Sequence, residues 1–576
     1  MKKMSLLVLI SLGALMLNAQ NYRLTWGEEI KLKKGTADLD VISADKTGLF
    51  FTEERKKSGI SLLGSGMTSS YKLTKLDQNF SEQFDKEYKR ELKGLDFHSF
   101  ERMGDDLYMF ASDYDRKEKA FSVLGAKIDK NSGDLISDFK ELGRYQLESK
   151  RDNYDIKMTR ILNNKALLMV ANISGKDRVS LGVSVLDNAL KTKQNTVINI
   201  SFDPGLYQLQ DVQITNNNKI IVLGKVFEET QIGKKKRKKL IFKEYALSIF
   251  NEKGEKEKDV TTDSEDRYIL GGKLIQQNTG ELLLAGFYCK NAKKADINGF
   301  YINKVDADKG ELVLSSFQDI NPEMLGKSFT DATDDDDQTR QEKKDAAKAK
   351  DNDEEDDFPN QYIIKSVDIN PVDNSILITS EISKYQHYSY TSSTYNYTTR
   401  TYTTTTTNVH RFTNQDIMII NADKDGKIKW VNDLPKSQVE EIRTTGSYQG
   451  LIGFTRDYGG YFAARGGMPY HSSYSSLIQN NTLVLLFNDH TSNNVNPQYG
   501  DKVKTVYNFR KRSNVYGVSI DLATGKMVRK TIASNNDETI LMPRHAFVVN
   551  NEFIVPSWRQ HALAKTELKF AKIAVK

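Results

Sequence analysis

Two series of short turns recur along the chain, and their spacing constrains the fold more than any other feature. The first series contains eight turns rich in Asn, Asp and Gly, which begin at residues 43, 102, 163, 215, 276, 370, 479 and 550. Apolar, alternating segments flank each turn, such as DVQI and IIVLGKVF on either side of TNNNK at residue 215. Because Asn and Gly accept positive φ at little cost, each turn predicts a tight hairpin between two strands.

The second series of turns lies between members of the first. Its seven copies are LDQNFSEQF at 76, DKNSGDLIS at 129, LDNALKTK at 186, NEKGEKEK at 251, DADKGELVL at 306, NADKDGKIKW at 421 and DLATGKMV at 521. The repeating unit is therefore four strands, A to D, with tight A–B and C–D turns. Four-stranded units repeated at this spacing are typical of a β-propeller.

We predict an all-β chain forming a single eight-bladed β-propeller over residues 20–576, with seven blades as the alternative if one unit is misread. The last unit supplies only three strands, ILMPRHAFVV, EFIVPSWRQ and ELKFAKIAV. Residues 22–32, YRLTWGEEIKL, are a spare strand at the other end of the chain. Pairing this segment with residues 567–575 completes the last blade, closes the ring and removes an exposed sheet edge.

The NADKDGKIKW turn also resembles a calcium-binding loop, because oxygen-bearing side chains stand at alternate positions, Asn421, Asp423 and Asp425, before Gly426. An EF-hand loop needs a bidentate Glu at its twelfth position. That position is Asn432. We interpret the stretch as a C–D hairpin turn, and we predict no metal and no cofactor.

The turns DLATGKMV and NADKDGKIKW resemble the repeat of the PQQ-like quinoprotein propellers. Those proteins place a Trp in nearly every blade, whereas this chain has only Trp26, Trp430 and Trp558 and lacks a vicinal Cys pair. PQQ binding is therefore not implied. The chain also resembles exported propellers of the Bacteroidetes kind, with a signal ending in Asn-Ala-Gln and a body rich in Lys, Asn and Tyr, which implies location more than activity.

The N-terminus reads as a secretory signal peptide over residues 1–19. Lys2 and Lys3 precede an apolar run over residues 5–17, and Leu17-Asn18-Ala19 forms the cleavage site. The only cysteine, Cys289, excludes a disulfide framework, a Cys-rich zinc site and a lipid anchor after the signal. We expect a mature chain without a transmembrane segment, periplasmic or extracellular, with outer-membrane association as a further option.

The long insertions all fall in B–C or D–A connections, which share one face of a propeller. They are QIGKKKRKKLIF at 231, the acidic insert over 331–357, the Tyr/Thr-rich loop over 385–410, and the segments beginning at 446 and 490. The acidic insert should be disordered, and the Tyr/Thr-rich loop should extend as a hairpin. Insertions on one face of a rigid scaffold are typical of a binding surface.

We therefore expect an exported binding or scaffold propeller that engages a protein or cell-envelope glycan through its loop-rich face. Export excludes nuclear import as the role of the basic run KKKRKK, and we expect no nucleic-acid partner. We interpret the run as a solvated hairpin tip, with contact to a polyanionic surface or to the acidic insert as the alternatives. Aromatic faces suit stacking on sugars or packing on protein. The candidate ligand-binding residues are Tyr395, Tyr397, Tyr458, Tyr461, Trp558 and Arg559.

The alternatives are a subunit of an envelope complex and an enzyme acting on a polysaccharide or peptide at the channel mouth near blades 7 and 8. The candidate catalytic residues are His471, Asp489, His490, Arg544 and His561. Two His with an Asp could bind a metal or move protons. The chain has no HExxH spacing, Gly-x-Ser-x-Gly elbow, phosphate loop or Asp box, so a binding role is the stronger prediction.

Overall fold

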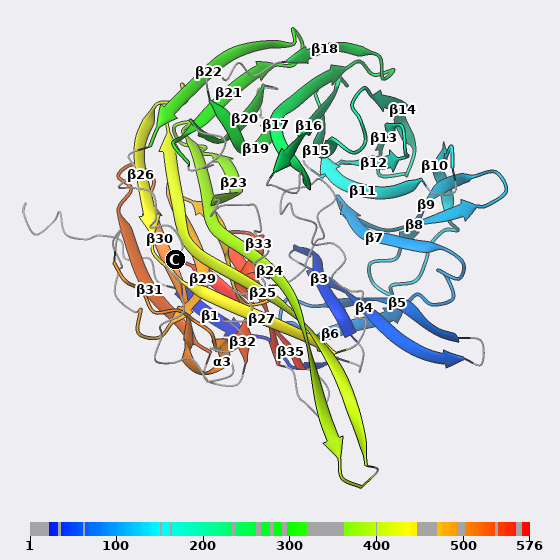
Figure 1. The fold of residues 1–576 in the computed structure, drawn as a ribbon, viewed down its shortest axis with the longest axis vertical. Helices are drawn as coiled ribbons and strands as arrows, with labels where there is room; N and C mark the ends of the chain where they lie inside the picture. Colours follow the sequence, from blue (N-terminus) through cyan, green and yellow to red (C-terminus); the bar gives the residue numbers. More distant parts are fainter. Residues whose placement is uncertain are drawn as a thin grey trace, which may run out of the picture.

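The computed structural model describes residues 22–576 apart from 33–35, 46, 62–63, 150–151, 162–163, 233–236, 261–266, 277–280, 291–296, 321–361, 399, 446–468, 494–500, 536–538 and 560–566. The expected signal peptide and the acidic insert over 331–357 lie outside the described residues. Eight antiparallel sheets follow one another around a ring (Figure 1). The prediction of an eight-bladed propeller is confirmed.

Each of the first seven blades contains strands A to D in chain order. Blade 1 consists of β3 (Thr36–Asp45), β4 (Gly48–Ser61), β5 (Gly64–Leu76) and β6 (Glu82–Glu87), and blade 2 of β7 (Asp96–Met103), β8 (Asp106–Asp115), β9 (Ala120–Ile128) and β10 (Lys140–Gln146). Blade 3 consists of β11 (Asn153–Ile161), β12 (Ala166–Ser174), β13 (Val179–Leu186) and β14 (Thr192–Ile200), and blade 4 of β15 (Tyr207–Ile214), β16 (Ile220–Ile232), β17 (Arg237–Phe250) and β18 (Lys256–Val260). Blade 5 consists of β19 (Tyr268–Gln276), β20 (Leu282–Cys289), β21 (Gly299–Asp306) and β22 (Glu311–Asp319). Blade 6 consists of β23 (Tyr362–Ile369), β24 (Ile376–Asn396), β25 (Thr401–Ala422) and β26 (Ile428–Leu434), and blade 7 of β28 (Tyr474–Gln479), β29 (Thr482–His490), β30 (Ser513–Asp521) and β31 (Met527–Ser534).

The eighth blade joins the two ends of the chain. Its C-terminal strands are β32 (Ile540–Leu541), β33 (Phe547–Val549), β34 (Glu552–Arg559) and β35 (Glu567–Val575). The N-terminal strands β1 (Tyr22–Trp26) and β2 (Ile30–Lys31) both pair with β35, in register from Tyr22 opposite Val575 to Lys31 opposite Glu567. The predicted closure is confirmed.

The first strand of this blade differs from the prediction. A single strand A was expected over ILMPRHAFVV, with Arg544 and His545 at its start. Instead, the 3-10 turn η2 (Pro543–His545) separates β32 from β33. Pro543 opens this turn, because its ring fixes φ and removes a backbone donor from the ladder.

Four of the C–D turns share one geometry. The side chain of the first residue accepts hydrogen bonds from the backbone N–H groups two and four residues later, and the fourth residue of the turn has positive φ. The first residues of these turns are Asp77, Asp187, Asn251 and Asp423. Asp423 thus bonds the N–H groups of Asp425 and Lys427, at 2.9 Å each. NADKDGKIKW is a hairpin turn like its relatives.

Two of these four turns place an apolar residue where Gly254 and Gly426 stand in the others. Phe80 has φ 63° and Leu190 has φ 54°, a left-handed conformation that costs energy for a side chain with a Cβ. Both side chains are buried among core residues. Their burial offsets the backbone strain.

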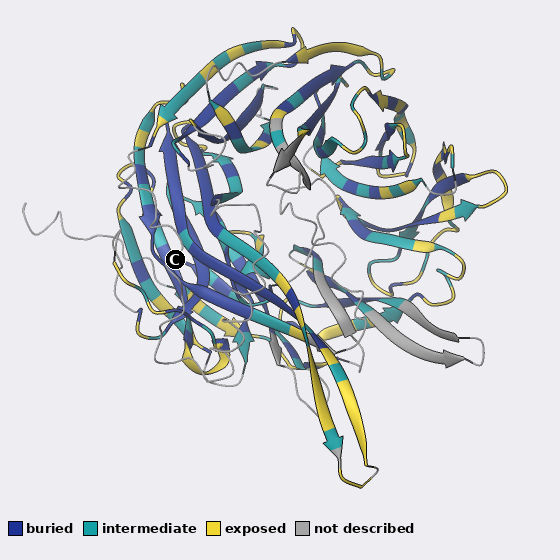
Figure 2. Ribbon diagram, viewed as in Figure 1, coloured by how far each residue is buried: buried dark blue, intermediate teal, exposed yellow. Residues whose placement is uncertain are grey.

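The core lies between neighbouring blades. Middle strands such as β13 and β20 are buried along their whole length, whereas outer strands such as β14 and β22 alternate with exposed positions (Figure 2). Both faces of a middle strand pack against neighbouring blades, and this explains why these strands are continuous apolar runs. Among the described residues, no helix is long and apolar enough to cross a membrane.

Two features of the strands were not predicted. β27 (Gln438–Thr445) adds a fifth strand to blade 6, paired with β25. In blade 1, β4 and β5 continue as a two-stranded ribbon from Lys56 to Ser61, beyond the last residue that β3 pairs. Blades 4 and 6 have extended hairpins of the same kind, so each of the three extended ribbons in the described part of the chain is a B–C connection.

Candidate binding ribbon and its buried base

The longest ribbon of the described chain is formed by β24 and β25. Strand β23 pairs with β24 only as far as Ile382. The β24–β25 ladder then continues from Ser383 opposite Asn414 to Asn396 opposite Thr401. We call this extension, residues 383–414, the ribbon; it projects from the body of the ring (Figure 1). The hairpin expected for the Tyr/Thr-rich segment 385–410 is present.

Composition explains why this segment stays extended. Thr and Tyr favour the pleated conformation, and hydroxyls on opposite strands can bond each other. Thr391 and Thr406 do so at 3.3 Å, and Ser393 and Thr404 at 3.2 Å. These hydroxyl pairs support the register of the outer part of the ribbon, whereas the stem also buries the apolar side chains of Tyr388, Val409 and Phe412.

Three tyrosines meet at the tip of the ribbon. Tyr395 lies opposite Tyr402, with ring centroids 4.9 Å apart, and Tyr397 packs edge-on to Tyr395 at 5.0 Å. Tyr397 is 86% exposed and Tyr402 is 72% exposed. Large aromatic rings exposed to this extent form a contact surface that no described part of the chain covers.

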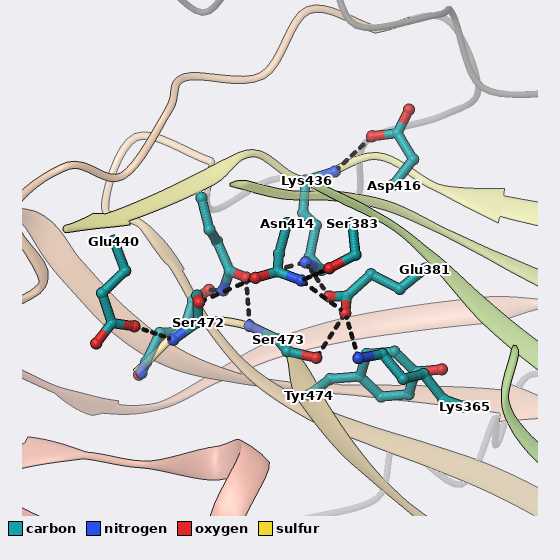
Figure 3. Close-up of polar contacts among 12 residues, drawn as sticks. Lys365, Glu381, Ser383, Asn414, Asp416, Lys436, Glu440, Ser472, Ser473 and Tyr474 are labelled. Atoms are coloured by element: carbon teal, nitrogen blue, oxygen red, sulfur yellow. Dashed lines mark hydrogen bonds and ion pairs between the residues drawn. The ribbon is translucent and has the colours of Figure 1, made fainter. Parts of the chain in front are cut away.

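The base of the ribbon is a buried polar cluster centred on Glu381 (Figure 3). Its carboxylate contacts the ammonium groups of Lys436 at 2.6 Å and Lys365 at 3.1 Å. It also accepts hydrogen bonds from Asn414 Nδ2 at 3.0 Å and Ser473 Oγ at 2.5 Å. Glu381 and Lys436 are fully buried, so each charge depends on the other for its stability inside the protein.

Electrostatics keep this cluster ionised. Burial by itself raises the pKa of Glu381, but the two lysine ammonium groups outweigh it and hold the pKa at about 2. Burial lowers the pKa of Lys365, and the nearby charge of Arg544 adds to that lowering, while Glu381 opposes it. Arg544, one of the candidate catalytic residues, therefore lies beside this cluster.

Strand β27 ties the ribbon base to blade 7. The Glu440 carboxylate accepts hydrogen bonds from three successive backbone N–H groups, those of Tyr470, His471 and Ser472, at 2.9 to 3.0 Å. Gln438 Oε1 accepts from the N–H of Ser473 at 2.7 Å. Two side chains of one strand thus fix the backbone that leads into β28.

Further bonds carry the connection to blade 8. Asn488 Nδ2 donates to the carbonyl oxygens of His471 and Leu541, both at 2.9 Å. Asn535 Nδ2 donates to Asn488 Oδ1 at 2.9 Å. Blades 6, 7 and 8 therefore form one hydrogen-bonded unit under the ribbon, which suits a rigid support.

The candidate catalytic residues of blade 7 serve internal contacts. Asp489 pairs with Arg529 at 2.7 Å, both fully buried, and accepts from Asn493 Nδ2. Burial raises the pKa of Asp489 despite the opposing guanidinium. His490 Nδ1 accepts from the N–H of Ser492.

His471 is also enclosed. Its ring lies 5.7 Å from that of Phe509, burial lowers its pKa, and its Nδ1 atom has no hydrogen-bond partner among the described residues. His561, Tyr458 and Tyr461 lie outside the described residues. Trp558 and Arg559 belong to β34, opposite Leu568 and Glu567, and only their backbones are described.

The residues at the centre of the cluster were not predicted from the sequence. Glu381 lies within the strand sequence ILITSEIS, where an acidic residue among apolar neighbours is a usable signal of a buried pair. Its partner Lys436 follows far along the chain, after β26, and nothing local predicts their contact. Over the described residues, no three His, Cys, Asp or Glu side chains gather where they could hold a metal ion.

Comparison with known proteins adds structural neighbours but no family. No family model matches the chain, and no curated protein matches it. Among solved structures, it is similar to the β-propeller domain of the Trilobed protease from Pyrococcus furiosus, at 9% identity and TM-score 0.33, over 87% of this chain and 99% of that one.

Two proteins of unknown function are also similar. The one from Bacteroides caccae has 8% identity and TM-score 0.26, covering 69% of this chain and 93% of its own. The one from Dyadobacter fermentans has 7% identity and TM-score 0.30, covering 73% and 94%. At these values the neighbours carry no argument about function, and the propeller assignment stands on the chain's own sheet topology.

Proposed function

We propose that this chain is an exported binding or scaffold propeller that engages a protein or glycan of the cell envelope through the ribbon of blade 6. The observation that carries the proposal is the exposed tyrosine cluster at the tip of a ribbon whose base is fixed by buried ion pairs. Aromatic side chains on a rigid support bind at small entropic cost. Export, periplasmic or extracellular location and a quinoprotein-like repeat are parts of this proposal.

The chemistry of the ribbon indicates the kind of partner. Residues 385–410 contain six Tyr and, besides two His, a single charged residue, Arg400. A surface with so little positive charge is poorly suited to a polyanion, because such ligands are held mainly by Lys and Arg. Tyrosine faces and threonine hydroxyls suit a protein surface or a sugar ring.

The enzymatic alternative has weaker support. Asp489 and His490 bond to their own surroundings, and His471 is enclosed against Phe509. No observation on the described residues favours a reaction at this place over a structural role.

The proposal is tested by affinity capture from the native cell envelope with the wild-type chain and the double variant Tyr397→Ala, Tyr402→Ala. The matched control is Tyr268→Ala, which removes a 49% exposed tyrosine on blade 5. We expect the tip variant to lose the captured partner and the control to keep it. Mass spectrometry identifies a protein partner, and binding to isolated envelope polysaccharide identifies a glycan. Equal capture by all three chains would refute the role of the tip.

A further inference from the structure

Two histidines face each other on the stem of the ribbon. His387 on β24 lies directly opposite His410 on β25. Their rings stack with centroids 4.5 Å apart and an angle of 23° between the planes. His387 is exposed and His410 is buried, so the pair can be reached from solvent on the His387 side.

A third side chain orients the buried ring. The Tyr385 hydroxyl lies 2.7 Å from Nδ1 of His410. When Nδ1–H donates to this hydroxyl oxygen, Nε2 carries the free lone pair. Histidines that bind metals are held in this way, with the second ring nitrogen bonded to a neighbouring group that fixes the tautomer.

We propose that His387 and His410 chelate a borderline divalent transition-metal ion, Zn²⁺ or Cu²⁺, on the stem of the ribbon. Two imidazole nitrogens bound to one tetrahedral ion are about 3.3 Å apart, given metal–nitrogen bonds of about 2.0–2.1 Å. The ring centroids are 4.5 Å apart, and rotation of the exposed His387 side chain about its torsions brings the two nitrogens to this separation while Tyr385 holds the His410 ring. Imidazole nitrogen is a preferred ligand for both ions.

The site keeps open coordination positions. Over the described residues, no third His, Cys, Asp or Glu joins the pair, so water completes the coordination sphere in the isolated protein. A side chain of a partner can replace that water. The metal site stands independently of the proposed binding function, since it rests on the histidine pair and not on the tyrosine tip.

The test is calorimetric titration of the metal-free, full-length protein with ZnCl₂ and with CuSO₄. We expect His387→Ala and His410→Ala each to weaken binding by more than about tenfold, and Tyr385→Phe to weaken it by about tenfold while keeping the site. The control His98→Ala removes a histidine from blade 2 and should leave the affinity unchanged. Electron paramagnetic resonance of the Cu²⁺ complex should show two nitrogen ligands in the wild type and one in His387→Ala.

Two outcomes overturn the proposal. One is an affinity and nitrogen count that stay the same in His387→Ala, and the other is an equal loss in His98→Ala. Because His387 is exposed, its substitution leaves the fold intact and decides the matter even where His410→Ala lowers stability.

Discussion

The Ser473 hydroxyl donates a hydrogen bond to the Glu381 carboxylate over 2.5 Å, and this contact joins blade 7 to the base of the ribbon in blade 6. Ser473 adopts φ 74°, a conformation uncommon for a residue with a side chain. The backbone accepts this strain where Gln438 and Glu381 hold Ser473 from both its N–H and its hydroxyl. The ribbon is therefore anchored to its neighbour at a defined point.

Neutralising the centre of the cluster should destabilise the protein strongly. Glu381→Gln leaves the buried ammonium group of Lys436 and the partly exposed one of Lys365 without their counter-charge, and breaking the buried Glu381–Lys436 pair costs about 3 to 5 kcal/mol. Urea unfolding of the purified chain measures the loss. The control Asp425→Asn removes a carboxylate whose partner Lys424 is exposed, and its cost should stay below about 1 kcal/mol. Similar costs for both variants would show that Glu381 is not an essential counter-charge.

The same carboxylate should make stability depend on acid. The pKa of Glu381 is about 2 in the folded chain against 4.5 for the free group. The contribution of this pKa shift to the free energy of unfolding is on the order of 3 kcal/mol. It is present above pH 4.5 and is lost as the pH falls from 4.5 towards 2. Unfolding free energies at pH 7, 4.5 and 3 should fall less steeply in Glu381→Gln than in the wild type. Parallel slopes would contradict the assignment.

The closure of the ring can be tested with a cross-link. Arg23 lies directly opposite Ala574 in the β1–β35 ladder. The pair Arg23→Cys, Ala574→Cys should form a disulfide on mild oxidation and raise the unfolding temperature, because the bond closes nearly the whole chain into a loop. Cys289 is buried in blade 5 and should not compete. The pair Arg23→Cys, Ala571→Cys is displaced by three positions along β35 and should stay reduced; equal bonding in both pairs would argue against the register.

Much of the fold follows from local signals, and the candidate site does not. Each hairpin has its signal in a short local stretch, because the turn needs residues that accept positive φ. Both turn series and the number of blades could therefore be predicted. The unpaired strand at residues 22–32 predicted the closure. Strand β27 was missed because it follows β26 without a turn of either series, and its partner β25 lies earlier in the chain.

The buried cluster depends on contacts that sequence order does not encode. Glu381, Lys436 and Ser473 come from a strand, a connection and the start of another blade, and only the packing of blades 6 and 7 brings them together. The buried partner of Asp489 was not predicted, because Arg529 comes from β31, which lies two strands away from β29 in the sheet of blade 7. The prominence of the Tyr/Thr hairpin was predictable, because its composition is unlike that of any other segment.

The central claim is that the tyrosine tip contacts a partner in the envelope, and a photo-cross-linker tests it most directly. A benzophenone amino acid in place of Tyr397, in the protein expressed in its native envelope, should give a discrete cross-linked adduct on irradiation. The same amino acid in place of Tyr268 on blade 5 should give none. An adduct at Tyr268 of equal yield, or no adduct at Tyr397, would contradict the account.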